Sequence, residues 1–378
     1  MTAPIFKKTM LLGAGLAAML GAATPALAQD PAQAAAQDPH QMAGSEGEFP
    51  RLRLAGFGDI NFGRQEHTEG PKNFSLGQFV LHLTSQMSSR VTFLGEISFT
   101  ARSDAGTGTP AAPGYNVEIE RMIVRFDRSD QLKVSFGRYH TPINYWNTQF
   151  HHGQWLQTTI SRPEMIQFGG RFLPVHFVGA LAEGAVPAGG LNIGYRGGVG
   201  NGRGNIISRG GDAGDNNNEL SYLAGLTSKP DALFGLEAGV SFLADTIGAT
   251  GGTKVPEQIV SGYVAYQKET PELIAEVASV RHDIPGTGPV WSHAYYLQGA
   301  YRFGFDDRKW KGYYRFEHIG IPTADIAFAN VPLLDGSTLG IRYDASSYAA
   351  IKVEYRTWTR GAGSTRNSGG FFQLSFTF

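Results

Sequence analysis

From residue 50 to the end, the sequence is made of short runs in which apolar and polar side chains alternate, each bounded by Gly, Asn, Asp or Pro. Residues 90–102 show the pattern clearly: one face carries Val91, Phe93, Gly95, Ile97 and Phe99, and the other carries Arg90, Thr92, Glu96, Ser98, Thr100 and Arg102. Residues 310–317 and 351–357 divide in the same way. Strands with this period, about ten residues long, predict an all-β, antiparallel transmembrane β-barrel with an apolar outer face and a wet interior.

The last strand strengthens this prediction. Phe372, Leu374, Phe376 and the terminal Phe378 share one face, while Gln373, Ser375 and Thr377 share the other. A chain that ends on an aromatic residue after such alternation resembles the signal recognised by the outer-membrane barrel assembly machinery. The alternative is the edge strand of a soluble β-sandwich, which also alternates but places its aromatic residues inward and does not need a dozen such strands.

The lengths of the connections indicate how many strands there are. Short connections are expected at 87–89, 127–130, 187–190, 229–231, 270–271, 304–308 and 346–348. Long ones are expected at 65–73, 103–114, 141–174, 201–217, 246–256, 283–290, 320–336 and 359–368. Because barrels of this kind alternate short periplasmic turns with longer extracellular loops, the order predicts sixteen strands and an aqueous interior. An alternative parse divides the neighbourhood of 163–172 into two further strands and gives eighteen.

Residues 141–174 form the third and longest of the expected loops. The candidate constriction residues within it are Trp146, His151, His152, Trp155, Arg162, Glu164 and Arg171. So many aromatic side chains do not suit a loop that extends into water, and long loops in compact folds are usually functional or packed on something. We therefore expect the loop to fold into the barrel, with an external lid or an oligomer contact as the alternatives.

Basic residues are expected on the inner face of the last strands. The set comprises Arg302, Lys311, Arg315, Arg342, Lys352 and Arg356, against the acidic Glu317, Asp344 and Glu354. A basic wall favours anions through its local field, so the set predicts a mild anion preference. The alternative is that acids and bases cancel as salt bridges along the wall.

The N-terminus has the form of a secretory signal peptide over residues 1–28. Lys7 and Lys8 precede an apolar run at 10–22, and small residues at 26–28 precede a cut at Gln29. A retained N-terminal anchor is the alternative. Residues 29–49 are expected to be a flexible periplasmic lead-in, or a short helix, and 50–378 the outer-membrane barrel.

Composition narrows the function classes. A formal charge of −1 does not suggest a nucleic-acid partner, the absence of cysteine excludes disulfides, and 50 glycines with 12% aromatic residues disfavour a helical protein.

No catalytic residue, cofactor or metal site is expected. His151 and His152 are adjacent, so in an extended loop they point apart, and no third ligand lies nearby in sequence. A Ser, His and acid set at one depth is not expected either, which disfavours the rival reading of a barrel enzyme such as a phospholipase or protease. A third reading, a structural or adhesive barrel, would need longer surface loops.

Residues 117–143 carry a resemblance to a known family. An alternating strand around Ile119-Glu120-Arg121-Met122 is followed by a short turn and then by Phe136-Gly137-Arg138-Tyr139-His140-Thr141-Pro142-Ile143. This resembles the strand, turn and strand that precede the constriction loop in the phosphate-selective porins O and P of Gram-negative bacteria. The resemblance implies a passive, homotrimeric diffusion porin that sits in outer-membrane lipid and lipopolysaccharide and passes small ions or solutes. Phosphate selectivity does not follow, because the loop offers only Arg162 and Arg171 against Glu164.

Overall fold

The computed structural model describes residues 49–65, 73–102, 106–109, 111, 113–168, 171–204, 207, 211–215, 217–248, 252–361 and 363–378. The expected signal peptide (1–28) and all but the last residue of the expected lead-in (29–49) lie outside the described residues, so both remain predictions. No helix within these described ranges is long and apolar enough to cross a membrane.

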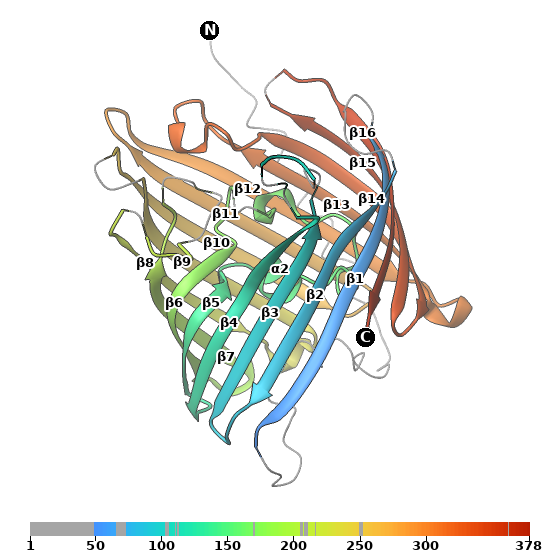
Figure 1. The fold of residues 1–378 in the computed structure, drawn as a ribbon, viewed down its shortest axis with the longest axis horizontal. Helices are drawn as coiled ribbons and strands as arrows, with labels where there is room; N and C mark the ends of the chain where they lie inside the picture. The colour runs from blue at the N-terminus through green and yellow to red at the C-terminus, as the bar shows by residue number, and fades with distance from the viewer. Residues whose placement is uncertain are drawn as a thin grey trace. The chain divides into compact units, whose positions relative to one another are not determined.

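Sixteen antiparallel strands form one closed barrel, in which each strand pairs with its neighbours in the chain and β1 pairs with β16 (Figure 1). The strands are β1 (Arg51–Gln65), β2 (Phe74–Gln86), β3 (Val91–Ala101), β4 (Tyr115–Ser129), β5 (Leu132–His140), β6 (His176–Val186), β7 (Ile193–Asn201), β8 (Leu220–Ser228), β9 (Leu236–Ile247), β10 (Val255–Gln267), β11 (Glu272–Ile284), β12 (Gly288–Arg302), β13 (Trp310–Gly320), β14 (Leu334–Ser346), β15 (Ala349–Arg360) and β16 (Asn367–Thr377). The predicted fold class and strand number are confirmed.

The alternative with eighteen strands is wrong. The described part of 163–172 contains the short 3₁₀ helix η2 (Glu164–Ile166) and no strand. One expected loop is also wrong, because β11 and β12 are joined by residues 285–287 alone rather than by 283–290. The Thr287 N–H donates to the Ile284 carbonyl at 3.0 Å, so alternation continues to Ile284 and the Pro and Gly residues make a tight turn.

The two faces of the barrel differ as the alternation predicts. Large apolar side chains are exposed on the outer face, among them Val240, Val260, Val277, Leu297, Leu339 and Val353. Polar side chains point inward and are buried, among them Ser241, Ser261, Glu276, Gln298, Arg315 and Lys352. A β-strand alternates its faces residue by residue, so one sequence supplies both surfaces.

The last strand closes the barrel. β16 pairs with β1 from Phe57↔Thr377 to Gln65↔Gly369, and the terminal Phe378 exchanges backbone hydrogen bonds with Gly56. The Phe378 ring stacks on Phe79 of β2, with 5.9 Å between ring centroids. The alternation of Phe372, Leu374 and Phe376 with the buried Gln373 and Ser375 therefore belongs to the seam, and its role as an assembly signal remains a prediction.

Candidate functional site

The loop between β5 and β6, residues 141–175, is called the inward loop below. Its base is closed by the Thr141 N–H, which donates to the Val175 carbonyl at 2.9 Å. Asn147, in the short helix α2 (Tyr145–Gln149), donates to the same two backbone segments, at 3.0 Å to Thr141 and 3.1 Å to Val175. These bonds hold the start and the end of the loop together.

The first half of the inward loop reaches the far side of the barrel. Ser261 on β10 donates to the Ile143 carbonyl at 2.7 Å. Glu276 on β11 accepts the Trp146 N–H at 2.7 Å and the Asn144 amide, and Trp146 is fully buried. Because these partners lie on the inner face of strands that are not neighbours of β5 or β6, the prediction that the loop folds inward is confirmed.

The second half of the loop rests on β13, β14 and β15. Arg342 donates to the backbone carbonyls of Trp155 at 2.8 Å and Gln157 at 3.0 Å. Lys352 donates to Gln157 at 2.8 Å and also to Thr159 at 3.2 Å. A loop without regular backbone pairing needs such partners for its carbonyl groups.

Arg315 is completely buried and binds both the backbone and a side chain of the loop. Its guanidinium donates to the Ser161 carbonyl at 2.8 Å, to the Ser161 hydroxyl at 2.6 Å and to the Arg162 carbonyl at 3.2 Å. On the acidic side, Glu354 accepts the Ile160 N–H at 2.9 Å. Several of the expected wall residues therefore hold the loop in place.

Most cations of the expected basic wall also have an acidic partner. The pairs are Arg302 with Asp344 (2.6 Å), Lys311 with Glu269 and Glu272 (3.0 Å each), Arg315 with Glu317 (3.3 Å), Arg342 with Asp344 (2.7 Å), and Arg356 with Glu354. In the turn before β11, burial would raise the pKa of Glu269, but Lys311 and Arg302 outweigh it and lower that pKa to about 2. The wall is therefore a set of ion pairs rather than a row of exposed cations.

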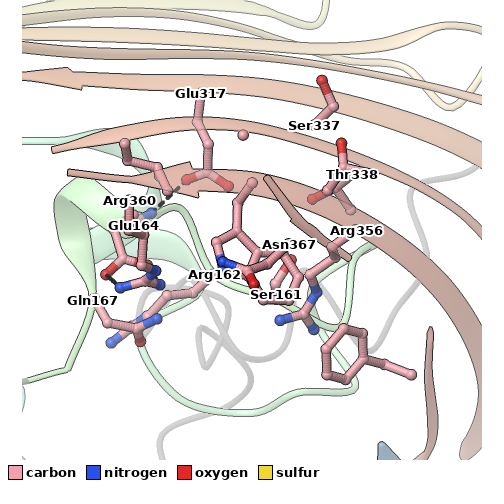
Figure 2. Close-up of a pocket in the computed structure, with 15 residues that line it drawn as sticks. Ser161, Arg162, Glu164, Gln167, Glu317, Ser337, Thr338, Arg356, Arg360 and Asn367 are labelled. Carbon is pink, nitrogen blue, oxygen red and sulfur yellow. Dashed lines mark hydrogen bonds and ion pairs between the residues drawn. The ribbon is translucent and has the colours of Figure 1, made fainter. Parts of the chain in front are cut away.

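A cavity of about 290 Å³ lies between the inward loop and the strands β13 to β16 (Figure 2). Its charged lining residues are Arg162, Glu164, Glu317, Arg356 and Arg360. Arg360 pairs with Glu164 through two contacts, at 2.8 and 3.1 Å, and the Glu164 N–H donates to Glu317 at 2.7 Å. Three cations thus face two acids here, which is the lining from which a charge preference could arise.

The remaining expected loop residues divide between core and surface. Trp155 is buried, and the Arg342 guanidinium lies 5.6 Å from its ring centroid. Arg162 is buried, with its guanidinium 3.8 Å from the centroid of Phe168 and a 2.8 Å hydrogen bond to the His151 carbonyl. Arg171 is exposed and does not line the cavity described above.

His151 and His152 do not point apart. Their ring centroids are 4.5 Å apart, and they meet Glu120 of β4, His140 of β5 and His176 of β6 so that one ligand atom from each residue lies within 4.8 Å of every other. The expectation failed because it assumed an extended loop, whereas the chain bends after α2. Burial lowers the pKa of His151 well below its usual value, and His140 and Arg162 add to the effect.

Gly153 makes that bend. Its φ is +91°, in the region that favours glycine, and an added Cβ would lie 3.2 Å from Phe57 Cγ of β1 and 3.1 Å from Leu156 Cδ1. The histidine pair thus precedes the turn and the charge-anchored residues follow it.

Sequence reasoning missed a second polar cluster, and it was wrong that no Ser, His and acid would meet. His282 of β11 lies 2.8 Å from Asp325 and 2.9 Å from Glu257 of β10, and Ser292 of β12 donates to Asp325 at 2.6 Å. A catalytic triad needs the histidine to accept the serine proton, but both ring nitrogens of His282 face carboxylates instead. The cluster therefore fastens the connection between β13 and β14, which carries Asp325, to the inner wall.

No family model matches this sequence, and neither does any curated protein. Several solved structures are similar in fold. The anion-selective porin from Comamonas acidovorans has a TM-score of 0.58 at 14% identity, covering 87% of this chain and 100% of that one. The outer membrane channel DcaP of Acinetobacter baumannii has a TM-score of 0.57 at 12% identity, covering 89% and 100%. The trimer form of OmpT, an outer membrane protein of Vibrio cholerae, has a TM-score of 0.54 at 13% identity, covering 88% and 100%. At these identities the likeness shows a shared porin-type barrel fold, and the resemblance to the phosphate-selective family is not confirmed.

Proposed function

We propose that this chain is a porin of the bacterial outer membrane, through which small hydrophilic solutes diffuse passively. The observation that carries the proposal is the inward loop, bound to β10 and β11 on one side and to β13, β14 and β15 on the other. A sixteen-stranded barrel is wide enough to leave an aqueous channel. A loop anchored across its interior narrows such a channel to a selective constriction. The solved porins and channels of similar fold support the same conclusion.

Single-channel recording of the purified protein in a planar lipid bilayer tests this function. The wild type should give stable open conductance, and its absence would contradict the porin proposal. Deleting 146–159 removes most of the loop, including the anchored residues Trp146, Trp155 and Gln157, and should raise the conductance. Deleting 363–365 between β15 and β16 is the control, because the hydrogen bonds of Ser364 to other described residues are local, to Arg360 and Gly361. If both deletions leave the conductance unchanged, the loop does not set the constriction.

We infer a mild anion preference, as the cavity of Figure 2 supports. Arg162, Arg356 and Arg360 line the cavity with Glu164 and Glu317, whereas Glu354, which pairs with Arg356, is not a lining residue. Field lines concentrate in narrow, low-dielectric passages, so a small excess of positive charge at a constriction is effective. Reversal potentials across a salt gradient should report anion selectivity, and Arg356→Gln should reduce it. A cation-selective reversal potential would contradict the preference alone and leave the porin function standing.

We further propose that the chain assembles as a homotrimer in outer-membrane lipid and lipopolysaccharide, after insertion by the barrel assembly machinery through Phe372, Leu374, Phe376 and Phe378. The exposed apolar outer face and the trimer form of a protein of similar fold support this. Native mass spectrometry from detergent should give three chains per particle. A single chain per particle in mild detergent would contradict the trimer, and normal insertion of Phe378→Ser would contradict the assembly signal.

A further inference from the structure

The histidine cluster beneath the inward loop has no role in the proposed diffusion function. It brings together residues from three strands and one loop: Glu120 on β4, His140 on β5, His151 and His152 on the inward loop, and His176 on β6. Glu120 and His140, His151 and His152 are nearly or fully buried, and His176 forms the edge that retains some exposure. We propose that these five residues form a binding site for a divalent transition-metal ion of the zinc class, which cross-links the inward loop to β4, β5 and β6.

Distances support a common centre. One ligand atom from each residue lies within 4.8 Å of all the others. The Nε2 atoms of His152 and His176 approach the same Glu120 oxygen, at 3.1 and 2.8 Å. Ligand atoms around a tetrahedral zinc ion, each about 2.0–2.1 Å from the metal, are about 3.3 Å from one another. The cluster therefore needs only small side-chain movements to enclose an ion, and it offers five donors where four suffice.

The outer hydrogen bonds orient the rings for this purpose. His151 Nδ1 lies 2.6 Å from the side-chain oxygen of Asn147, and His152 Nδ1 lies 3.0 Å from that of Gln78 on β2. An amide oxygen accepts only, so Nδ1 donates in both bonds, and in the neutral ring the lone pair is then on Nε2. Metal-bound histidines are usually held in this way, with the second nitrogen donating to an oxygen.

The inner nitrogens provide an independent observation. Among the described residues, Nε2 of His151 is buried without a hydrogen-bond or ion-pair partner, and His151 is 3% exposed, while Nε2 of His152 and of His176 share a single Glu120 oxygen. A buried polar atom without a partner costs about 1–3 kcal/mol, and several lone pairs that converge also repel one another. A bound cation satisfies all of them together.

The charges around the cluster permit a cation. Glu120 contributes one negative charge, while Arg162, which donates to the His151 carbonyl at 2.8 Å, contributes one positive charge. Glu96 pairs with Arg121 and lies 3.4 Å from His140 Nε2, and Arg138 pairs with Glu118 and Asp212. Imidazole nitrogen with one carboxylate is a donor set that suits zinc, copper or nickel rather than calcium or magnesium.

An ion can enter along one edge. The His176 side chain is 11% exposed, and Phe168, which stacks on His152 with 5.2 Å between centroids, is 38% exposed. A metal bound there would join loop residues to three strands, so it would restrict movement of the loop relative to the wall.

Zinc titration of the detergent-solubilised chain without a polyhistidine tag, after treatment with a chelator, tests the site by competition with a chromophoric zinc indicator. We expect one zinc ion per chain. His151→Gln combined with His152→Gln should abolish this binding, whereas His318→Gln, which removes a half-exposed histidine paired with Asp335, should leave it unchanged. No stoichiometric binding by the wild type, or equal binding by the double variant, would overturn the proposal.

Two further measurements keep the test decisive if the double variant does not fold. Gln78→Ala leaves every proposed ligand in place and removes the bond that orients His152, so the zinc affinity should fall by about 10–100-fold. X-ray absorption of the zinc-loaded wild type should show a shell of imidazole nitrogen. A shell without imidazole, or a Gln78→Ala affinity equal to wild type, would contradict the site. None of these readouts depends on conductance.

Discussion

The two halves of the inward loop are held in opposite ways. After Gly153, the backbone of residues 154–161 is bound by Arg315, Arg342, Lys352 and Glu354. Arg315, Arg342 and Glu354 also each pair with an oppositely charged residue of the wall. Before Gly153, His151 and His152 face Glu120 and two wall histidines, and the inner nitrogen of His151 has no partner within the described part of the chain. The difference teaches that the half after Gly153, called the anchored half below, is held by charged side chains of the wall, whereas the half before Gly153, called the histidine half, gathers imidazole rings around one carboxylate.

The largest effect on stability should come from removing a side chain that holds the anchored half of the loop. Arg315→Leu removes a fully buried guanidinium and leaves Glu317 and the Ser161 carbonyl without it. Removing one partner of a buried charge network costs about 3–5 kcal/mol, so the free energy of unfolding should fall by that amount. Urea unfolding in lipid vesicles, followed by tryptophan fluorescence, measures this, and the conductance should become unsteady. Arg302→Leu, at a wall pair with Glu269 and Asp344, is the control and should leave the conductance steady.

The next largest effect on stability should come from zinc binding to the histidine half of the loop. Zinc at 100 times its dissociation constant should raise the free energy of unfolding by about 2.7 kcal/mol, because it binds only the folded chain. The same unfolding experiment with and without zinc measures it. His151→Gln combined with His152→Gln should lose the zinc effect, while Arg315→Leu should keep it. If zinc stabilises the wild type, the double histidine variant and Arg315→Leu equally, the two halves of the loop do not differ in the way described.

A smaller effect is expected at the turn that separates the halves. Gly153→Ala places a Cβ in a left-handed conformation that costs about 1–2 kcal/mol, and it also presses on Phe57 and Leu156. The thermal midpoint should fall, and the zinc affinity should fall with it because His152 precedes the turn. Gly363→Ala, also at positive φ but with nothing within 4 Å of its Cβ, serves as the control for backbone strain alone. Zinc affinity that is unchanged in Gly153→Ala would show that the bend does not position the histidines.

The smallest effect on stability should come from the exposed ion pair between Arg360 and Glu164, next to the anchored half of the loop. Arg360 is 47% exposed and pairs with Glu164, and such surface pairs contribute about 0–1 kcal/mol. Arg360→Gln should therefore leave the unfolding midpoint nearly unchanged while shifting the reversal potential toward cations. A loss of stability as large as that of Arg315→Leu would show that the anchoring extends into the cavity of Figure 2.

Much of the fold was predictable from local pattern. The alternation of Val91, Phe93 and Ile97 with Thr92 and Glu96 determines which face meets the outside, because a strand turns successive side chains to opposite sides. The order of short and long connections then yields sixteen strands and places the third loop. The connection at 285–287 was misjudged because Pro285 and the glycines beside it were interpreted as a loop, whereas the turn there is tight.

The candidate site was predictable only in position. Arg315, Arg342 and Lys352 were correctly placed on the inner face, but nothing in their spacing indicated that they bind backbone carbonyls of a loop more than 150 residues earlier in the chain. The pairing of acids with bases along the wall was one of two readings that the sequence left open. His282 and Asp325 were not singled out, because they meet only when the connection after β13 folds inward.

By itself, the sequence determined the barrel, its two faces and the place of the inward loop, because strand alternation and turn length act over a few residues. Only the tertiary structure decided what that loop touches. Glu120, His140 and His176 lie on three strands and become neighbours of His151 and His152 when the barrel closes and the chain bends at Gly153. Side chains so far apart in the chain are united by closure of the sheet, and no local pattern records that event.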